Sequence, residues 1–384
     1  MDIRPGNTIS SITGDQNPVE YRFGRILGEG SYGTVWLAET SGAGELPAQK
    51  QVAIKILKAQ SSCKNIELEL HKYIEEIRAH RTMDARNIVS FLGEFNAENA
   101  HGLTFTRFKG TLRDLFNFYA KKQVGFSVPF VRFCAGEILQ GLNFLHSIGI
   151  MFLDLKMGNI LTSMTPAEID NDEHGLVLCI TDFGSATRTG TVPDWHCGSF
   201  EYDAPEIQIR RKFSTKSDIW SLMCIVYELF AGGILFDLFN SCGTRYDADL
   251  ESLSGASGCG DTAPDCVSRD DQSSDVESSD WSSDDDEPIT TDDKYRYWLL
   301  ATRILGLPPD SLKTDEIFNS LGRLKYDAEI QRVSINDIIM LNVEIDPCDA
   351  ANVAAFMERG IQWLCDDRAS AEELLKDKWL NTIE

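Results

Sequence analysis

A short cluster of polar residues lies between two apolar runs in residues 150–161, I-M-F-L-D-L-K-M-G-N-I-L. The carboxylate of Asp154 can accept the proton of a hydroxyl. The amide oxygen of Asn159 is a hard ligand of the kind that suits Mg²⁺. Lys156 lies two residues after Asp154 and can neutralise a phosphoryl group in transfer. Transfer of a phosphoryl group to a hydroxyl would use all three.

A second acid, Asp182, occurs in I-T-D-F-G, residues 180–184, and offers another hard oxygen for a divalent cation. Each residue alone also has an ordinary structural interpretation. Asp154 and Asp182 could be turn carboxylates, and Asn159 could be a helix cap. The chemical interpretation therefore depends on the other segments that accompany these residues.

Three glycines, Gly28, Gly30 and Gly33, belong to the run G-E-G-S-Y-G-T-V, in which small residues let backbone N–H groups approach phosphate oxygens. The same glycines also fit a tight hairpin or the phosphate loop of a dinucleotide-binding fold. The strand-like run V-A-I-K decides between them, because it ends in Lys55, where a dinucleotide fold would place an acid after a helix. A bound triphosphate needs a buried cation nearby, and Lys55 could supply it.

The helix expected over residues 65–78 offers three glutamates for an ion pair with Lys55, namely Glu67, Glu69 and Glu76. Apolar residues recur at helical spacing in this segment. Glu69 lies among them, so we expect it to face the sheet and to reach Lys55. Glu76 stays open as an alternative, because its spacing to the next strand would suit the pair equally well.

The segments occur in an order that resembles a eukaryotic-type protein kinase. Residues 150–161 are similar to its catalytic loop, 182–184 to its D-F-G motif and 204–206 to its A-P-E motif. The resemblance covers about residues 21–381. Four motifs in the right order make coincidence implausible.

The resemblance implies that ATP and Mg²⁺ are the cofactors and that other proteins are the substrates. Lysine at position 156 points to serine or threonine as the acceptor. Arg368 would form an ion pair with Glu206, and Thr106 would be the gatekeeper residue at the back of the nucleotide site. The expected catalytic residues are Asp154, Lys156, Lys55 and Glu69, and the expected metal ligands are Asn159 and Asp182. The expected nucleotide-binding residues are Leu27, Gly28, Glu29, Gly30, Ser31, Tyr32, Gly33, Val35, Ala53, Lys55 and Asn159.

The fold class expected is α+β, a bilobal protein kinase fold. Residues 1–20 are predicted to be a flexible arm. Short β-branched and aromatic runs separated by glycine turns predict a β-rich small lobe with one main helix over 21–108. Long apolar helical patterns predict a large lobe over 109–384.

An acidic stretch over about residues 242–293 interrupts the large lobe. Residues 241–293 contain 16 acidic and 2 basic residues, a net −14 of the chain's −24. Such a segment cannot bury enough apolar surface to offset the entropy of ordering, which predicts a disordered insertion. Two roles stay open. It is either a docking tail for basic, Arg/Ser-rich substrates or a solvated spacer with acidophilic phosphorylation sites such as Ser274, Ser282 and Ser283.

Phe152-Leu153 stands where the family usually has His-Arg before the catalytic aspartate. Phenylalanine can keep the packing role of the histidine, but leucine cannot bind a phosphate on the activation segment. Thr187, Thr189 and Thr191 are therefore expected not to need modification. The same departure supports an alternative, a catalytically weak pseudokinase that acts as a nucleotide-binding scaffold, although the catalytic and metal-binding residues are retained.

Residues 294–309 resemble the helix ending in I-L-G-x-P of the cyclin-dependent, dual-specificity and SR-protein kinase group. Asp203 departs from that group, which usually has arginine before A-P-E.

The composition limits the partners. The net charge of −24 disfavours nucleic acid and anionic membranes and favours cationic partners. Ten cysteines without a C-x-x-C pair suggest a reducing compartment. The apolar run over 219–239 is interrupted by acids and glycines, which indicates a buried helix and not a membrane span. We expect an intracellular protein, in the cytoplasm or nucleus, with no nucleic-acid or membrane partner.

Overall fold

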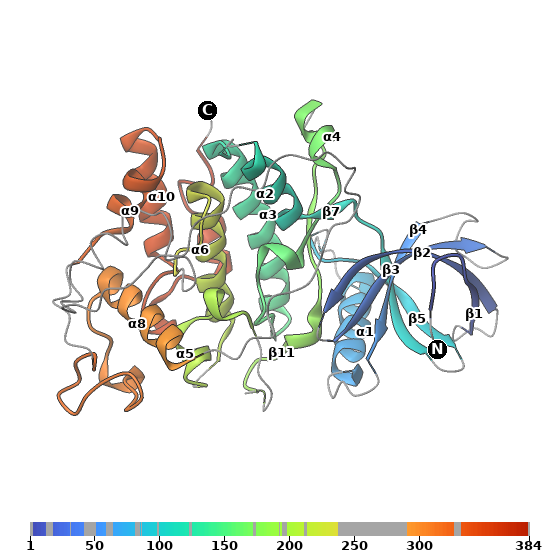
Figure 1. Cartoon of the computed structure of the whole chain (residues 1–384), viewed down its shortest axis with the longest axis horizontal. Helices are drawn as coiled ribbons and strands as arrows, with labels where there is room; N and C mark the ends of the chain where they lie inside the picture. The colour runs from blue at the N-terminus through green and yellow to red at the C-terminus, as the bar shows by residue number, and fades with distance from the viewer. Residues whose placement is uncertain are drawn as a thin grey trace, which may run out of the picture.

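The arrangement of the chain comes from a computed structural model. A β-rich part lies at one end of the molecule and a helical part at the other (Figure 1). This is the two-lobed α+β arrangement that the sequence predicts. The structure describes residues 3–12, 18–30, 32–41, 51–58, 64–80, 85, 87–97, 100–122, 125–171, 174–191, 193, 198–210, 213–236, 290–325 and 332–382.

The small lobe is an antiparallel sheet of six strands in the order β1-β2-β3-β4-β6-β5, accompanied by helix α1, Lys64–His80. Aromatic residues Phe23, Trp36 and Phe95 form a core on one face. On the other face Leu68 of α1 packs with Leu103. The strands are β1 Thr8–Ile12, β2 Pro18–Gly30, β3 Gly33–Ser41, β4 Gln51–Leu57, β5 Phe91–Ala97 and β6 Ala100–Thr106.

The prediction of a flexible arm over residues 1–20 is wrong for strand β1. This strand pairs with β2, and Ile9 lies opposite Tyr21. Its inward side chains Ile9 and Ser11 are buried, and Ser11 accepts a hydrogen bond from the backbone of Asn96. Only one inward residue of β1 is apolar, so the alternation that marks a half-buried strand is almost invisible in the sequence.

The large lobe is built from helices around α3, Val128–Ser147, and α6, Thr215–Ala231. Short strands carry the polar turns on the side of the small lobe. These strands are β7 Gly110–Thr111, β8 Ile150–Met151, β9 Ile160–Thr162, β10 Leu178–Ile180 and β11 Thr187–Arg188. The other helices are α2 Leu112–Lys121, α4 Pro166–Asn171, α5 Pro205–Gln208, α8 Thr291–Leu305, α9 Ile335–Asn342, α10 Pro347–Glu358 and α11 Ala371–Leu375.

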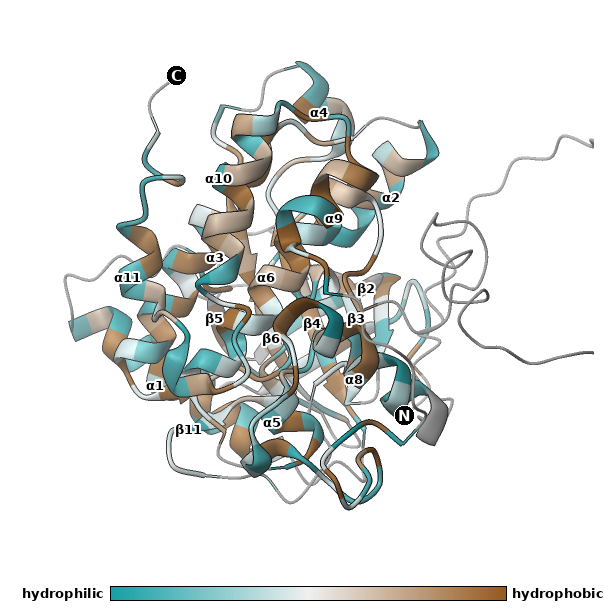
Figure 2. Cartoon of the chain, turned by 90° about the vertical axis from the view of Figure 1, so that its left-hand side faces the viewer, coloured by the Kyte–Doolittle hydropathy of each residue, from teal (hydrophilic) through white to brown (hydrophobic). Residues whose placement is uncertain are grey.

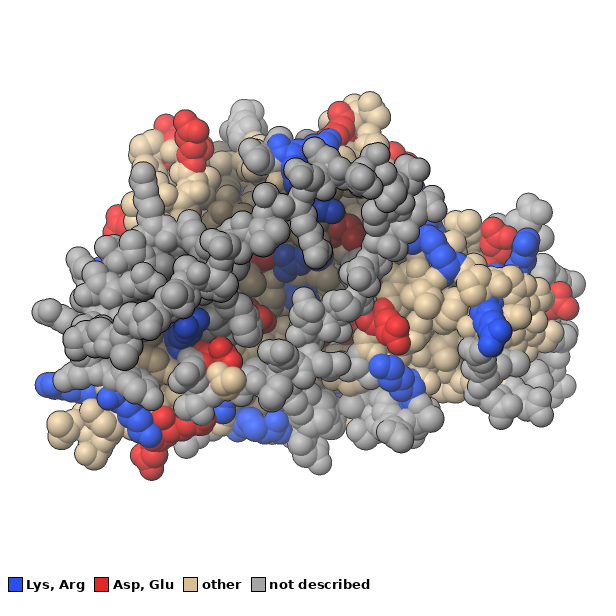
Figure 3. Space-filling view, in the orientation of Figure 1, with Lys and Arg blue, Asp and Glu red and all other residues tan. Residues whose placement is uncertain are grey.

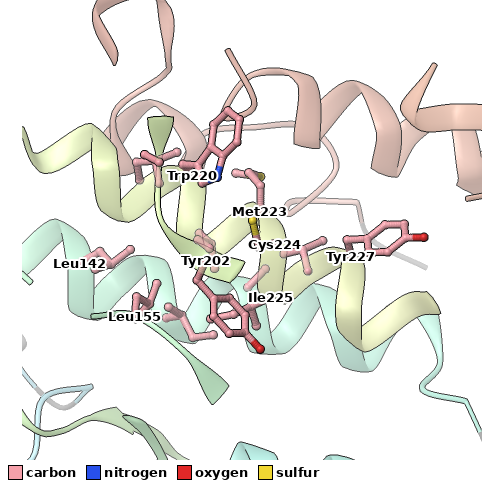
Figure 4. Packing of buried hydrophobic residues seen from close by; sticks show 14 of the residues in the cluster. Leu142, Leu155, Tyr202, Trp220, Met223, Cys224, Ile225 and Tyr227 are labelled. Carbon is pink, nitrogen blue, oxygen red and sulfur yellow. The ribbon is translucent and has the colours of Figure 1, made fainter. Parts of the chain in front are cut away.

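Helix α6 forms the centre of the large-lobe core. Its residues Trp220, Met223 and Ile225 are fully buried, and Leu142 of α3 lies close to them (Figure 4). Figure 2 shows hydrophobic residues along α6 and hydrophilic ones on parts of α2 and α9. The apolar run that begins at residue 219 is thus core, as predicted. In the described ranges, no helix is both long and apolar enough to cross a membrane.

Most of the predicted acidic insertion, residues 242–289, lies outside the described residues. Its last four residues, 290–293, are not disordered but open α8, which corrects the predicted end of the segment. Thr290 and Asp293 form a capping box, in which each side chain accepts a hydrogen bond from the other's backbone N–H. The buried Tyr297 and Trp298 that follow anchor this helix in the core.

The expected ion pair of Arg368 and Glu206 is confirmed and is buried. The two guanidinium Nη atoms lie 2.7 and 2.8 Å from the two carboxylate oxygens. The same guanidinium donates to the carbonyl oxygens of Gln362 and Lys216 at 2.9 and 3.2 Å. Arg368 therefore ties three separate segments of the large lobe together.

Replacing Arg368 by lysine should lower the free energy of unfolding by about 2 kcal/mol, because an ammonium group cannot reproduce the bidentate pair and the carbonyl contacts. Denaturant unfolding measures this difference. Lys376→Arg is the matched control, since its pair with Glu372 is exposed. A loss below about 0.5 kcal/mol, the range of ordinary surface changes, would contradict the role given to Arg368.

Candidate active site

Lys55 of β4 joins the two lobes through its ammonium group. Its Nζ lies 2.8 and 2.9 Å from the carboxylate oxygens of Glu67 in α1 and 2.7 Å from Oδ1 of Asp182 in the large lobe. Burial alone would lower the pKa of Lys55, but Asp182 and Glu67 together raise it above its usual value. Lys55 is therefore a permanent cation held between two acids.

The prediction that Glu69 pairs with Lys55 is wrong. Glu67 makes this contact and is 2% exposed, whereas the Glu69 side chain is 73% exposed. The alternative, Glu76, is exposed as well. The buried face of α1 includes two polar residues, Glu67 and His71, so a pattern drawn from apolar residues alone misplaces the centre of that face.

Asp154 and Asn159 lie in the turn between β8 and β9 and contact each other. The Nδ2 atom of Asn159 donates to Oδ2 and to the backbone oxygen of Asp154, at 2.9 and 2.8 Å. Ser199 donates to Oδ1 of Asp154 at 3.1 Å and accepts a hydrogen bond from Lys156 at 2.8 Å. Burial, reinforced by the nearby Asp182 charge, raises the pKa of Asp154 to about 6. A carboxylate of this kind is poised to exchange a proton near neutral pH.

Two backbone conformations that non-glycine residues rarely adopt orient this site. Leu153 has φ 64° and Asp182 has φ 65°. Asp218, at the start of α6, accepts hydrogen bonds from the backbone N–H groups of Phe152 and Leu153 at 3.0 and 2.7 Å. Those bonds hold the turn that presents Asp154, so a buried acid of the core supports strain at the site.

The aromatic packing beneath Asp182 confirms the role expected for Phe152. The ring of Phe183 lies 5.2 Å from that of Phe152 and 4.8 Å from that of His71 on α1, measured between centroids. Burial lowers the pKa of His71 to about 3, so its ring stays neutral in this stack. The stack joins α1 to the segment that carries Asp182.

The glycine run forms the tight end of the β2–β3 hairpin, where Gly30 lies opposite Gly33. A Cβ atom at Gly33 would lie 2.4 Å from the carbonyl oxygen of Ile56, so only glycine fits there. At Gly28 and Gly30 a Cβ atom would meet nothing within 4 Å, which leaves their backbone accessible. Tyr32 reaches across to the large lobe, where its hydroxyl lies 3.3 Å from the Ser185 hydroxyl. Ser31 lies outside the described residues.

The described residues thus bring together one lysine, two aspartates and one asparagine from three segments. Figure 3 shows basic and acidic side chains gathered in the hollow between the lobes. A family model described as a protein kinase domain matches residues 21–380. The chain belongs to the protein kinase family.

Curated relatives are protein kinases that are considerably longer than the matched region. The chain is 30% identical to the serine/threonine-protein kinase BCK1/SLK1/SSP31 of Saccharomyces cerevisiae, over 59% of this chain and 15% of that protein. It is 31% identical to 3-phosphoinositide-dependent protein kinase 1 of Homo sapiens, over 56% of this chain and 36% of the relative. It is 32% identical to the MAP kinase kinase kinase mkh1 of Schizosaccharomyces pombe, over 60% of this chain and 20% of that protein. These relatives give no support to the cyclin-dependent and SR-protein kinase group suggested by residues 294–309.

The strand register corrects the gatekeeper assignment in this kinase. Thr106 pairs with Val52, whereas Phe105 pairs with Ala53 and Leu103 with Lys55. Residues directly opposite each other in a sheet point to the same face. Phe105 therefore shares the face of Ala53 and Lys55, and Thr106 points with Val52 to the other face.

Part of an apolar surface beside Lys55 was missed by the sequence interpretation, which predicted Ala53 but not Phe105, Phe108 or Leu161. Ala53, Phe105 and Phe108 pack in one cluster with Leu161, which comes from the large lobe. A surface of this kind suits a flat aromatic base. Leu161 lies in strand β9, two residues after Asn159. The alternation of side chains along that strand is the sequence signal that could have predicted its position.

Members of this kinase family use Mg²⁺, and the free oxygens of the site suit that ion. Asn159 uses its Nδ2 atom on Asp154, which leaves Oδ1 available. Asp182 uses Oδ1 on Lys55, which leaves Oδ2. In the described part of the chain, no group of three or more His, Cys, Asp or Glu residues could hold a metal alone. Two protein oxygens with phosphate oxygens and water are the usual way in which Mg²⁺ is held in such sites.

Proposed function

We propose that this kinase transfers the γ-phosphate of ATP to serine or threonine hydroxyls of other proteins. The observation that carries the proposal is the double contact of Lys55 with Glu67 and Asp182, beside Asp154. This arrangement supplies a cation for phosphates, hard oxygens for a metal and a base for a hydroxyl in one place. Relatives named serine/threonine kinases and the lysine at position 156 favour serine and threonine as acceptors.

The proposed mechanism assigns one task to each group. Lys55 binds the α- and β-phosphates while Glu67 holds its ammonium in position. Asn159 and Asp182 would hold Mg²⁺, which would offset the charge of the phosphates when bound. Asp154 accepts the proton of the acceptor hydroxyl as its oxygen bonds to the γ-phosphorus, and the bond from that phosphorus to the departing ADP oxygen breaks. Lys156 offsets the charge of the transferring group.

A pseudokinase scaffold is the competing function, and Leu153 is the observation in its favour. Incubating the purified protein with ATP labelled at the γ-phosphate, Mg²⁺ and mixed basic proteins separates the two. Transfer of label by the wild type and not by Asp154→Asn supports the proposal. Nucleotide binding without transfer by the wild type would establish the scaffold instead.

Activity should not require phosphate on the activation segment. Leu153 is buried and offers no donor to a phosphate, and its backbone is already held by Asp218. Treatment with a protein phosphatase should leave the initial rate unchanged, as should the double variant Thr189→Val, Thr191→Val. Mass spectrometry of the treated sample confirms removal of phosphate. A rate that collapses after treatment would show that another cation replaces the missing arginine.

Shortening Phe105 should enlarge the back of the nucleotide site. Phe105→Ala should lower KM at least about tenfold for ATP analogues with a bulky group on the adenine amino nitrogen, because the lost ring frees a large apolar volume. Thr106→Ala is the matched control, since Thr106 points to the opposite face. Improved use of the analogues by Thr106→Ala, and not by Phe105→Ala, would restore the original assignment.

A further inference from the structure

Asp203 is a buried acid of the large lobe. It is 4% exposed, and across the residues that the structure describes its carboxylate forms no hydrogen bond or ion pair. Its backbone is held firmly, because the Tyr297 hydroxyl donates to its carbonyl oxygen at 2.9 Å. The carboxylate also packs on Gly198, where a Cβ atom would lie 2.0 Å from Oδ1. The fold therefore accommodates this acid closely without satisfying its charge.

The charges around Asp203 are mostly negative. Burial raises the pKa of Asp203 well above its usual range, and Asp154, Glu201 and Glu206 raise it further, whereas Lys156 acts in the opposite direction. Among the described residues, the cations Lys156 and Arg368 are both engaged by other groups. Lys156 donates to Ser199, and Arg368 is engaged by Glu206. Burial without a counter-charge favours the protonated acid, and a cation that enters from outside the chain would favour the ionised carboxylate and pair with it.

Asp203 lies close to the place where an acceptor hydroxyl would be. Ser199 contacts the catalytic Asp154, and a single 3₁₀ turn, Phe200–Tyr202, separates it from Asp203. Such a turn advances about 2 Å per residue, so Asp203, four residues after Ser199, lies roughly 8 Å from it. An extended substrate advances about 3.3 Å per residue. Side chains within two residues of the acceptor thus pass within reach of Asp203.

We propose that Asp203 is a specificity-determining residue that selects substrates with lysine or arginine within two residues of the phosphorylated serine or threonine. This inference rests on the proposed function and names its substrate class. The substrate cation would form the ion pair that Asp203 does not make with any described residue of the free protein. Arginine or lysine would serve, since both carry their charge on a long apolar stem that can enter a buried site.

Matched peptides test this selectivity without any change to the protein. Each peptide has one serine, with lysine in turn at each of the two positions before and after it, and a partner peptide has norleucine there. Wild-type kcat/KM should be about tenfold to a hundredfold higher for lysine at one of these positions, the range expected for a charge-assisted bond. Equal values for lysine and norleucine at all four positions would overturn the proposal.

Variants then assign the preference to Asp203. Asp203→Asn and Asp203→Leu should remove the preference for lysine, mainly through KM, while kcat on the norleucine peptide stays near that of the wild type. Asp310→Asn is the matched control, because the Asp310 side chain is 96% exposed. A lysine preference that survives both Asp203 variants would overturn the assignment. Failure of the wild type to label any peptide would refute the proposed function, and this inference with it, whereas labelling without preference refutes this inference alone.

Discussion

Replacing Asp154 by asparagine should lower kcat by about 10²–10⁴-fold, the range expected for loss of a positioned general base. The asparagine amide keeps the shape of the side chain and can still contact Asn159 and Ser199. It cannot accept a proton from the acceptor hydroxyl. Initial rates of phosphate transfer to a peptide measure the loss, and stabilisation of the protein by ATP and Mg²⁺ checks that nucleotide binding is intact.

The pH dependence of kcat gives the same prediction a second readout. The pKa of Asp154 is raised to about 6 by burial and by the Asp182 charge. Only the deprotonated carboxylate can accept the proton, so kcat should fall as the pH drops below about 6 and level off above it. Asp310→Asn is the control variant and should follow the wild-type curve. A kcat that stays constant down to pH 5, or an Asp154→Asn enzyme with wild-type turnover, would remove Asp154 from its role as base.

Some of the residues that meet at this site could be predicted from the sequence. These are residues that lie close together in one motif, with apolar runs on both sides of that motif. Asp154 and Asn159 share one turn between strands, so five residues of separation already bring them together. Lys55 and Asp182 are far apart in the chain, and only the family resemblance predicted that both belong to one site. No local pattern could have supplied it, because the contact depends on how the two lobes pack.

The errors share a physical origin. Glu69 lies two residues from Glu67, which pairs with Lys55. Thr106 lies one residue from Phe105, which shares the face of Lys55. In a helix or strand such a shift turns the side chain to another face. Packing decides which face of a helix or strand is buried. Where that face contains polar residues such as His71, a pattern based on hydrophobicity does not predict it. Asp203, by contrast, stood out in the sequence as a departure, but only the structure shows that its carboxylate has no partner among the described residues.

The reassigned pair with Lys55 can be tested directly by comparing Glu67→Gln with Glu69→Gln. Glu67→Gln should lower kcat/KM about a hundredfold, within the 2–5 kcal/mol range for losing one partner of a buried charge pair. Without Glu67, Asp182 is the one carboxylate among the described residues that still pairs with Lys55, and the same acid is the proposed ligand of Mg²⁺. Lys55 would then lose its position as the phosphates arrive.

The Glu69→Gln variant is a matched control, since it makes the same chemical change two residues away on the exposed side of α1. Its kcat/KM should stay within about twofold of the wild type, because the median contribution of an exposed ion pair is small. Thermal unfolding of both variants separates loss of activity from loss of fold. A large loss in Glu69→Gln with an active Glu67→Gln would mean that α1 turns by about half a revolution in the working enzyme. In that case the contact between Glu67 and Lys55 would belong to an inactive state.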